Sequence, residues 1–97
     1  MDIKEAIKKA ISCVKDVFSD EKIEYVGLEE VRFDKEDGVW EVTVGFSRPW
    51  DSPKPVLNQF SEILNPTPPK MRHYKIVKID DTSGEVKAIE IREVAHA

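Results

Sequence analysis

Two stretches of the chain share one pattern, in which a β-rich run passes through a turn that begins with Asp and ends with Gly into a second β-rich run. The first turn spans 34–38 and the second spans 80–84, and in both the Gly lies four residues after the Asp. Asp and Gly are favoured in turns because the Asp side chain bonds nearby backbone amides and Gly tolerates left-handed backbone conformations. The pattern therefore predicts two β-hairpins.

The predicted strand at 39–46 has the clearest alternation of apolar and polar residues. Because successive side chains of a strand point to opposite faces, one face of this strand is apolar and packs on the core. That face carries Trp40, Val42, Val44 and Phe46.

The other predicted strands have a less regular alternation. Val31 and Phe33 are in phase, whereas Leu28 falls on the opposite face of the first strand. In the last strand Val86 and Ala88 lie in one phase and Ile89 and Ile91 lie in the other, which predicts a β-bulge near Ala88 or apolar contact on both faces. Contact on both faces would provide a surface for a partner.

The N-terminal stretch 3–18 carries apolar residues at spacings of three and four, which is typical of an amphipathic α-helix. Asp2 is a suitable N-cap, and the polar stretch 19–22 ends the helix. The fold class predicted is α+β, with an N-terminal helix packed on a four-stranded antiparallel sheet in the order α-β-β-loop/short α-β-β.

A connecting segment between the hairpins, 47–73, contains all six prolines of the chain. Proline resists helix and sheet alike, yet the apolar spacing inside the segment predicts a short helix near 54–64 with Pro55 in its first turn. With this segment included, residues 1–97 form a single domain, because the chain is long enough for one core.

Composition limits the classes of partner. Nineteen acidic against 15 basic residues give a net charge of −4, which does not favour nucleic acid, whose binding needs clustered cations. No apolar run is long enough to cross a membrane, so we expect a cytoplasmic protein. The single cysteine, Cys13, is consistent with a reducing compartment.

The run Tyr74-Lys75-Ile76-Val77-Lys78-Ile79-Asp80, followed by Ser83-Gly84-Glu85-Val86, resembles the closing hairpin of PepSY-type domains. The chain is similar as well to small stand-alone bacterial proteins of unknown function that share a Phe-Ser-Arg-Pro stretch, here 46–49. The resemblance implies a helix followed by strand pairs, and a peptidase-modulating or partner-binding role.

Residues with reactive side chains give little support for catalysis. Cys13 would need His73 or His96 beside it to act as a nucleophile, and its place on the helix favours a half-buried structural role. Acidic residues in the two turns could hold a cation, although Asp beside Gly is ordinary turn chemistry. We therefore expect a protein that is not an enzyme, with no catalytic, cofactor-binding or metal-binding residues.

The strongest binding candidates are aromatic and arginine side chains in or beside the connecting segment, because such residues are common interface anchors. They could instead seal the open end of the core. The leading hypothesis is a non-catalytic interaction module that binds a protein partner or forms a homodimer. Alternatives are a small acidic antitoxin or immunity-type protein, and a small-ligand protein or enzyme with a pocket under the connecting segment. The candidate residues are Arg48, Trp50, Phe60, Arg72 and Tyr74.

Overall fold

The structure is a computed structural model that describes residues 1–48 and 72–92. Its elements are α1 (Ile3–Val17), a short 3-10 turn η1 (Ser19–Glu21), β1 (Glu24–Asp34), β2 (Val39–Ser47), β3 (His73–Asp80) and β4 (Val86–Ile91).

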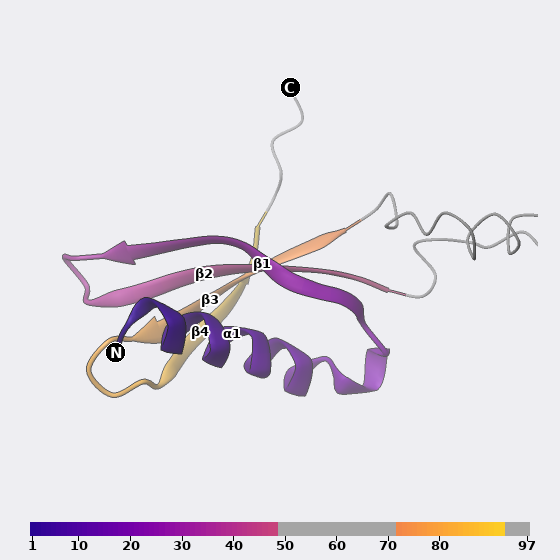
Figure 1. Ribbon diagram of the computed structural model, residues 1–97, viewed down its shortest axis with the longest axis horizontal. Helices are drawn as coiled ribbons and strands as arrows, with labels where there is room; N and C mark the ends of the chain where they lie inside the picture. The colour runs from indigo at the N-terminus through magenta and orange to yellow at the C-terminus, as the bar shows by residue number, and fades with distance from the viewer. Residues whose placement is uncertain (49–71, 93–97) are drawn as a thin grey trace, which may run out of the picture.

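The four strands form one antiparallel sheet in the order β1-β2-β3-β4, and α1 lies across one face of it (Figure 1). The predicted fold class is therefore confirmed. The helix predicted near 54–64 and all six prolines lie outside the described residues. Within the described part of the chain, no helix is long and apolar enough to span a membrane.

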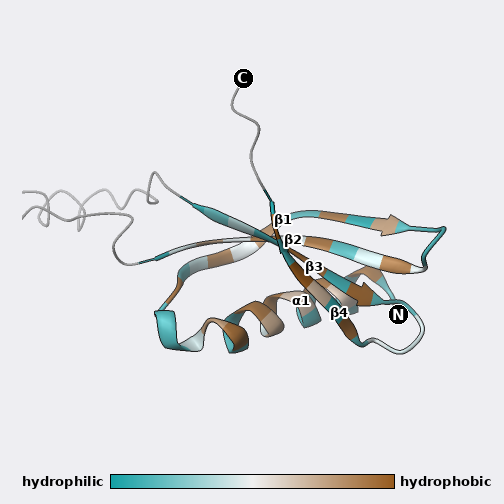
Figure 2. Ribbon diagram, turned by 180° about the vertical axis from the view of Figure 1, so that it is seen from behind, coloured by the Kyte–Doolittle hydropathy of each residue, from teal (hydrophilic) through white to brown (hydrophobic). Residues whose placement is uncertain are grey.

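Helix α1 begins where the sequence predicts, because the Asp2 carboxylate accepts a hydrogen bond of 2.8 Å from the backbone amide of Glu5. The residues that face the sheet are small, and Ala6, Ala10 and Val14 are fully buried. Small side chains let the helix axis approach the sheet closely. In Figure 2 the apolar bands of α1 alternate with polar ones, as expected for a helix with one buried side.

Strand β2 lies in the interior of the sheet and carries the predicted apolar face. Val42, Val44 and Phe46 are fully buried beneath the helix, and Trp40 packs against the same core. Val42 pairs with Val77 of β3, which extends this core surface to the next strand. Full burial of a side chain of this size contributes roughly 1.5–3 kcal/mol to folding.

Strand β1 differs from the prediction in the phase of its side chains. It extends from Glu24, and its register with β2 shifts between Glu24 and Gly27 and again between Leu28 and Glu30. The second shift places Leu28 opposite Val44, on the same face as the core residues. The prediction that Leu28 lies on the opposite face is therefore wrong, because a strict two-residue alternation does not hold across a β-bulge.

The predicted bulge near Ala88 is confirmed. The register of β4 with β3 shifts between Lys78, which pairs with Ala88, and Ile79, which pairs with Val86. The extra residue brings Val86 and Ile89 onto the same, helix-covered face, where both pack against the core.

The two hairpin turns use the same hydrogen bonds. In each, the Gly amide donates to the Asp carbonyl four residues earlier, and both distances are 2.8 Å. Gly38 and Gly84 have φ angles of +64° and +72°, in the left-handed region that favours glycine. The carboxylates of Asp34 and Asp80 each accept hydrogen bonds from the amides two and three residues later. The acidic residues that begin these turns thus hold the backbone.

The two turns also contact each other. The amide of Asp81 donates to the carbonyl of Gly38 at 2.9 Å, and the indole Nε1 of Trp40 donates to the Asp81 carboxylate at 2.8 Å. The N-terminal ammonium lies 3.6 Å from the same carboxylate. The start of the helix and both hairpins therefore meet at this end of the sheet.

The face of the sheet away from α1 carries ion pairs. Lys78 pairs with Glu90 at 3.2 Å, and Arg92 pairs with Glu30 at 3.4 Å. The second pair joins the two outer strands, β1 and β4. In a flat sheet these strands would lie three strand spacings of about 4.8 Å from each other. Thr43, on the same face of β2, is 4% exposed although no helix lies over it.

Asp80 makes the second hairpin sensitive to acid. The amide of Ser83, and then that of Thr82, lowers the pKa of the Asp80 carboxyl below its usual value of 3.8. A lowered pKa means that the ionised form stabilises the folded state. That stabilisation is complete above the usual pKa and is lost as the pH falls through the lowered one.

We expect Asp80→Asn to reduce the free energy of unfolding at pH 7, because the amide keeps an acceptor oxygen but loses its charge. The difference from the wild type should shrink as the pH falls below about 4, in urea denaturation from pH 7 to pH 2. Asp20→Asn, at an exposed residue of η1, is the control for the loss of one negative charge. A difference that stays constant over this range would contradict the role given to Asp80.

Candidate functional site

The two ends of the connecting segment leave the sheet side by side. Phe46 pairs with His73 and Gly45 pairs with Tyr74, so the end of β2 lies beside the start of β3. Three of the predicted binding residues, Arg48, Arg72 and Tyr74, are therefore close to this end of the sheet. The other two, Trp50 and Phe60, lie outside the described residues.

Arg48 is held between an acidic residue and an aromatic ring. Its Nη2 lies 3.1 Å from Oε2 of Glu21 in η1, and its guanidinium carbon lies 5.3 Å from the centre of the Phe46 ring. A cation at this distance over a ring is attracted to the negative face of the π system. Arg48 thus fixes the end of β2 against η1.

The Phe46 ring is the centre of a small aromatic cluster at the C-terminal end of α1. It lies 5.3 Å from the Phe18 ring and 5.9 Å from the His73 ring, and the Lys75 ammonium lies 5.8 Å from the centre of the Phe18 ring. Aromatic pairs at such separations add about 0.5–1.5 kcal/mol beyond the area they bury. The cluster gives this end of the sheet a rigid base.

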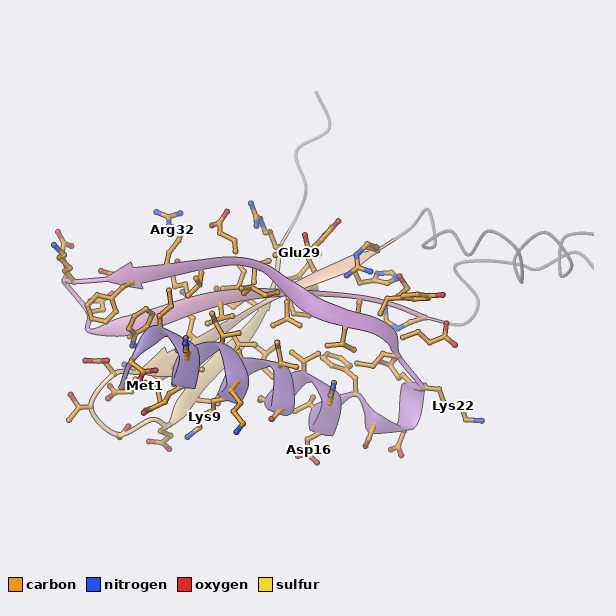
Figure 3. The ribbon with its side chains drawn as sticks, in the orientation of Figure 1. Met1, Lys9, Asp16, Lys22, Glu29 and Arg32 are labelled. Atoms are coloured by element: carbon orange, nitrogen blue, oxygen red, sulfur yellow. The ribbon has the colours of Figure 1, made fainter. Side chains whose placement is uncertain are left out.

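Arg72 connects the start of β3 to the edge strand β1. Its Nη2 donates to the carbonyl of Tyr25 at 2.9 Å and lies 3.3 Å from Oε1 of Glu29. Glu29 projects from the side of the sheet opposite α1 (Figure 3). The side chain of Arg72 therefore spans β2 on that side.

Gly45 has no side chain, and the Arg72–Glu29 ion pair occupies the space above it. A Cβ atom at Gly45 would lie 2.8 Å from Oε1 of Glu29 and 2.9 Å from Nη2 of Arg72, closer than a Cβ contact allows. Any other residue at this position would push the pair off the sheet. The glycine is therefore a specific requirement of the Arg72–Glu29 contact.

Tyr25 has a left-handed backbone conformation, which is unusual for a residue of its type. Its φ angle is +54°, in the left-handed region that is rare for a bulky side chain. The residue is 53% exposed to solvent. Tyr25 lies within the first bulge of β1, between Glu24 and Gly27. The left-handed backbone directs its carbonyl to Arg72 and leaves the phenol ring accessible.

Tyr74 is half-buried, and its backbone takes part in the pairing of the sheet. Its carbonyl accepts a hydrogen bond of 3.1 Å from the amide of Arg92, which extends the pairing of β3 with the chain beyond β4. Its side chain shares the ion-paired face of the sheet with Thr43 and Ile76, as the register requires.

Cys13 and the acidic residues of the two turns are the described residues considered for catalysis and for metal binding. Cys13 is half-buried on α1, and burial raises the pKa of its thiol, with a further rise from Asp16 and a decrease from Lys9. A raised pKa keeps the thiol protonated at neutral pH, which does not suit a nucleophile. Among residues 1–48 and 72–92, no group of three or more His, Cys, Asp or Glu residues is placed to hold a metal ion.

Three residues of this sheet end were not predicted from the sequence. Tyr25 and Glu29 belong to the irregular part of β1, and Glu21 lies in a turn that was read only as the polar end of the helix. Glu29 did interrupt the alternation of its strand, and this interruption was the available signal. Its partner Arg72, 43 residues away, could not be identified without the fold.

Comparison of the chain with protein-family models, with curated proteins and with solved structures gave no match. The resemblance to PepSY-type hairpins therefore stays a prediction.

We expect Gly45→Ala to break the Arg72–Glu29 contact and to destabilise the protein by no more than about 1 kcal/mol, the usual contribution of an exposed ion pair, because the new methyl group displaces two flexible side chains. Gly27→Ala is the matched control. Gly27 pairs directly with Gly45 on the neighbouring strand, and a Cβ there meets no atom within 4 Å. Equal unfolding free energies for the two variants in urea would show that the space over Gly45 is not needed.

Proposed function

We propose that this chain is a non-catalytic protein-interaction module whose contact surface is the sheet end around Tyr25 and Arg72. The observation that carries the proposal is the left-handed backbone of an exposed tyrosine, with φ of +54° and 53% exposure. A bulky residue in this conformation costs about 1–2 kcal/mol. Strain of this kind is common where a side chain is held in place for recognition.

The same contacts prepare the surface before any partner binds. Arg72 is held by Glu29 and by the Tyr25 carbonyl, and the Phe46 cluster supports the neighbouring strand ends. A side chain that is already ordered loses less conformational entropy on binding. Tyr and Arg are enriched among the residues that dominate binding energy, because each combines a large contact area with directed polar groups.

An exposed leucine lies near Tyr25 on the edge strand β1, on the helix-covered face of the sheet. Leu28 is among the exposed large apolar residues, and it follows Tyr25 by three positions on the edge strand. Glu29 and Arg72 supply charges of both signs on the opposite face of the sheet. A protein surface with an aromatic or aliphatic centre and a polar rim would match this combination.

We expect Tyr25→Asn to keep the fold and lose the partner. Asn tolerates the left-handed region, so the variant should be more stable by about 1 kcal/mol, which raises Tm by roughly 4–8 °C in a domain of this size. Affinity capture from the native host, with the full chain as bait and proteins identified by mass spectrometry, should show one or more proteins that the wild type retains and Tyr25→Asn does not.

Tyr25→Phe is the matched control, because it keeps the ring and the backbone strain. It should retain the same proteins as the wild type. The proposal is wrong if Tyr25→Asn captures the same proteins at the same level, or if the wild type captures nothing that a bait-free column does not. A variant with a lower Tm would show that the tyrosine supports the fold, which contradicts the strain argument.

A further inference from the structure

The two outer strands of the sheet each have a regular stretch with an open edge. In β1 the pairing with β2 is regular from Glu30 to Asp34, and in β4 the pairing with β3 is regular from Ala88 to Ile91. No described strand pairs with the outer edge of either stretch. In Figure 1 the stretch of β1 forms the upper left margin of the described chain. Unpaired edges of this kind are templates for pairing with another chain.

The hydrogen bonds of the sheet show which residues face the open edges. The carbonyl of Asp34 accepts from the amide of Gly38, so the backbone groups of Asp34 point toward β2. The amide of Arg92 donates to the carbonyl of Tyr74, so those of Arg92 point toward β3. Because this direction alternates along an antiparallel ladder, two residues in each stretch direct their N–H and C=O groups outward. These residues are Val31 and Phe33 in β1, and Ile89 and Ile91 in β4.

The residues with outward backbone groups are all apolar, and their side chains lie on the helix-covered face of the sheet. Phe33 is 40% exposed and Ile91 is 73% exposed, although α1 packs on this face. Helix α1 makes little contact with β4, so it does not cover Ile91. Burial of these two side chains against another strand would favour association.

The opposite face carries charges of both signs beside each open edge. Glu30 and Arg32 lie on this face of β1, and Glu90 and Arg92 lie on it in β4. Figure 3 shows that Arg32 projects away from α1, and none of the ion pairs among the described residues involves it. Arg92 contacts Glu30 of its own chain at 3.4 Å through one nitrogen, and its guanidinium has further N–H donors.

We propose that residues 30–34 of one copy of this chain pair antiparallel with residues 88–92 of a second copy, which joins β1 of one sheet to β4 of the next. The apolar residues with outward backbone groups then form hydrogen-bonded pairs, and Glu30 and Arg32 each meet a side chain of opposite sign. The β-bulge before Glu30 ends the regular stretch there, so the pairing ends at Arg92. The five pairs are Glu30–Arg92, Val31–Ile91, Arg32–Glu90, Phe33–Ile89 and Asp34–Ala88.

Charge favours this pairing over the pairing of like strands. Residues 30–34 paired with themselves would place Arg32 opposite Arg32, and Glu30 opposite Asp34. Residues 88–92 paired with themselves would place Glu90 opposite Glu90. Like charges directly opposite each other destabilise a pair of strands. The two edges are therefore complementary to each other and not to themselves.

An interface between two different edges is heterologous, so it repeats from copy to copy. Such contacts give closed rings or open chains of subunits, in which every inner copy uses both of its edges. The inference does not rest on the proposed role of Tyr25, which lies in the other half of β1.

Sedimentation velocity of the full chain at a series of concentrations tests the contact. We expect the wild type to form oligomers as its concentration rises. Arg32→Glu blocks the β1 edge and Ile91→Glu blocks the β4 edge, and each should weaken association by tenfold or more. Both residues are exposed, so circular dichroism should show an unchanged fold. An equal mixture of the two variants should form a dimer and nothing larger, because each variant keeps one open edge.

Two further variants serve as controls for these measurements. Val17→Glu places the same new charge on an exposed apolar residue of α1 and should associate like the wild type. Tyr25→Asn should associate normally too, which separates this inference from the proposed function.

Charge exchange tests the register. Glu90→Arg alone should weaken association, because the new cation opposes Arg32 of the next copy. Mixed with Arg32→Glu, it should restore the oligomers, since opposite charges then meet at both edges of each chain. A wild type that is monomeric at all concentrations, an association that Arg32→Glu leaves unchanged, or a mixture that stays monomeric would each overturn the proposal.

Discussion

The fold depends on the close contact between α1 and β2. Ala10 and Val14 are small enough for the helix to lie near the sheet, and Val42 and Val44 meet them from the interior strand. Among residues 1–48 and 72–92, the fully buried apolar side chains form one cluster around this contact. The hairpins, the bulges and the sheet end could change in sequence without loss of this contact. A cavity between α1 and β2 would remove the packing on which the other elements depend.

The hairpin turns then fix which residues reach the core. A slip of one residue in a strand would turn its apolar side chains to the opposite face. The Asp34–Gly38 and Asp80–Gly84 turns prevent this through the same set of backbone and carboxylate hydrogen bonds. The contact of Asp81 with Gly38 and Trp40 further aligns one hairpin with the other. The turn residues therefore fix the register of the strands. This structural role explains the similarity of the two turns without a shared chemical function.

Most of the fold could be predicted from the sequence because its signals are local. The apolar periodicity of α1, the alternation in β2 and the Asp-to-Gly turns each lie within a few neighbouring residues, and the bulge near Ala88 was visible as a change of phase. The first half of β1 was not predicted, since Tyr25 and Glu29 break the alternation that identifies a strand.

The sheet end was predicted in part. Arg48, Arg72 and Tyr74 were selected for their residue types, and the pairing of β2 with β3 brings them to one end of the sheet. Their partners Glu21, Tyr25 and Glu29 depend on contacts between residues 27 to 47 positions apart. Such pairings follow from topology and from the room over Gly45, and local patterns do not contain that information.

The two faces of the sheet should respond differently to the solution around them. The helix-covered face is held by apolar burial, which strongly hydrated salts such as sulfate strengthen. The opposite face is held by Arg92–Glu30 and Lys78–Glu90, and dissolved ions screen such exposed pairs. Arg92 joins the last described residues of the chain to β1, so added salt would loosen the outer strands from each other while the core beneath them tightens.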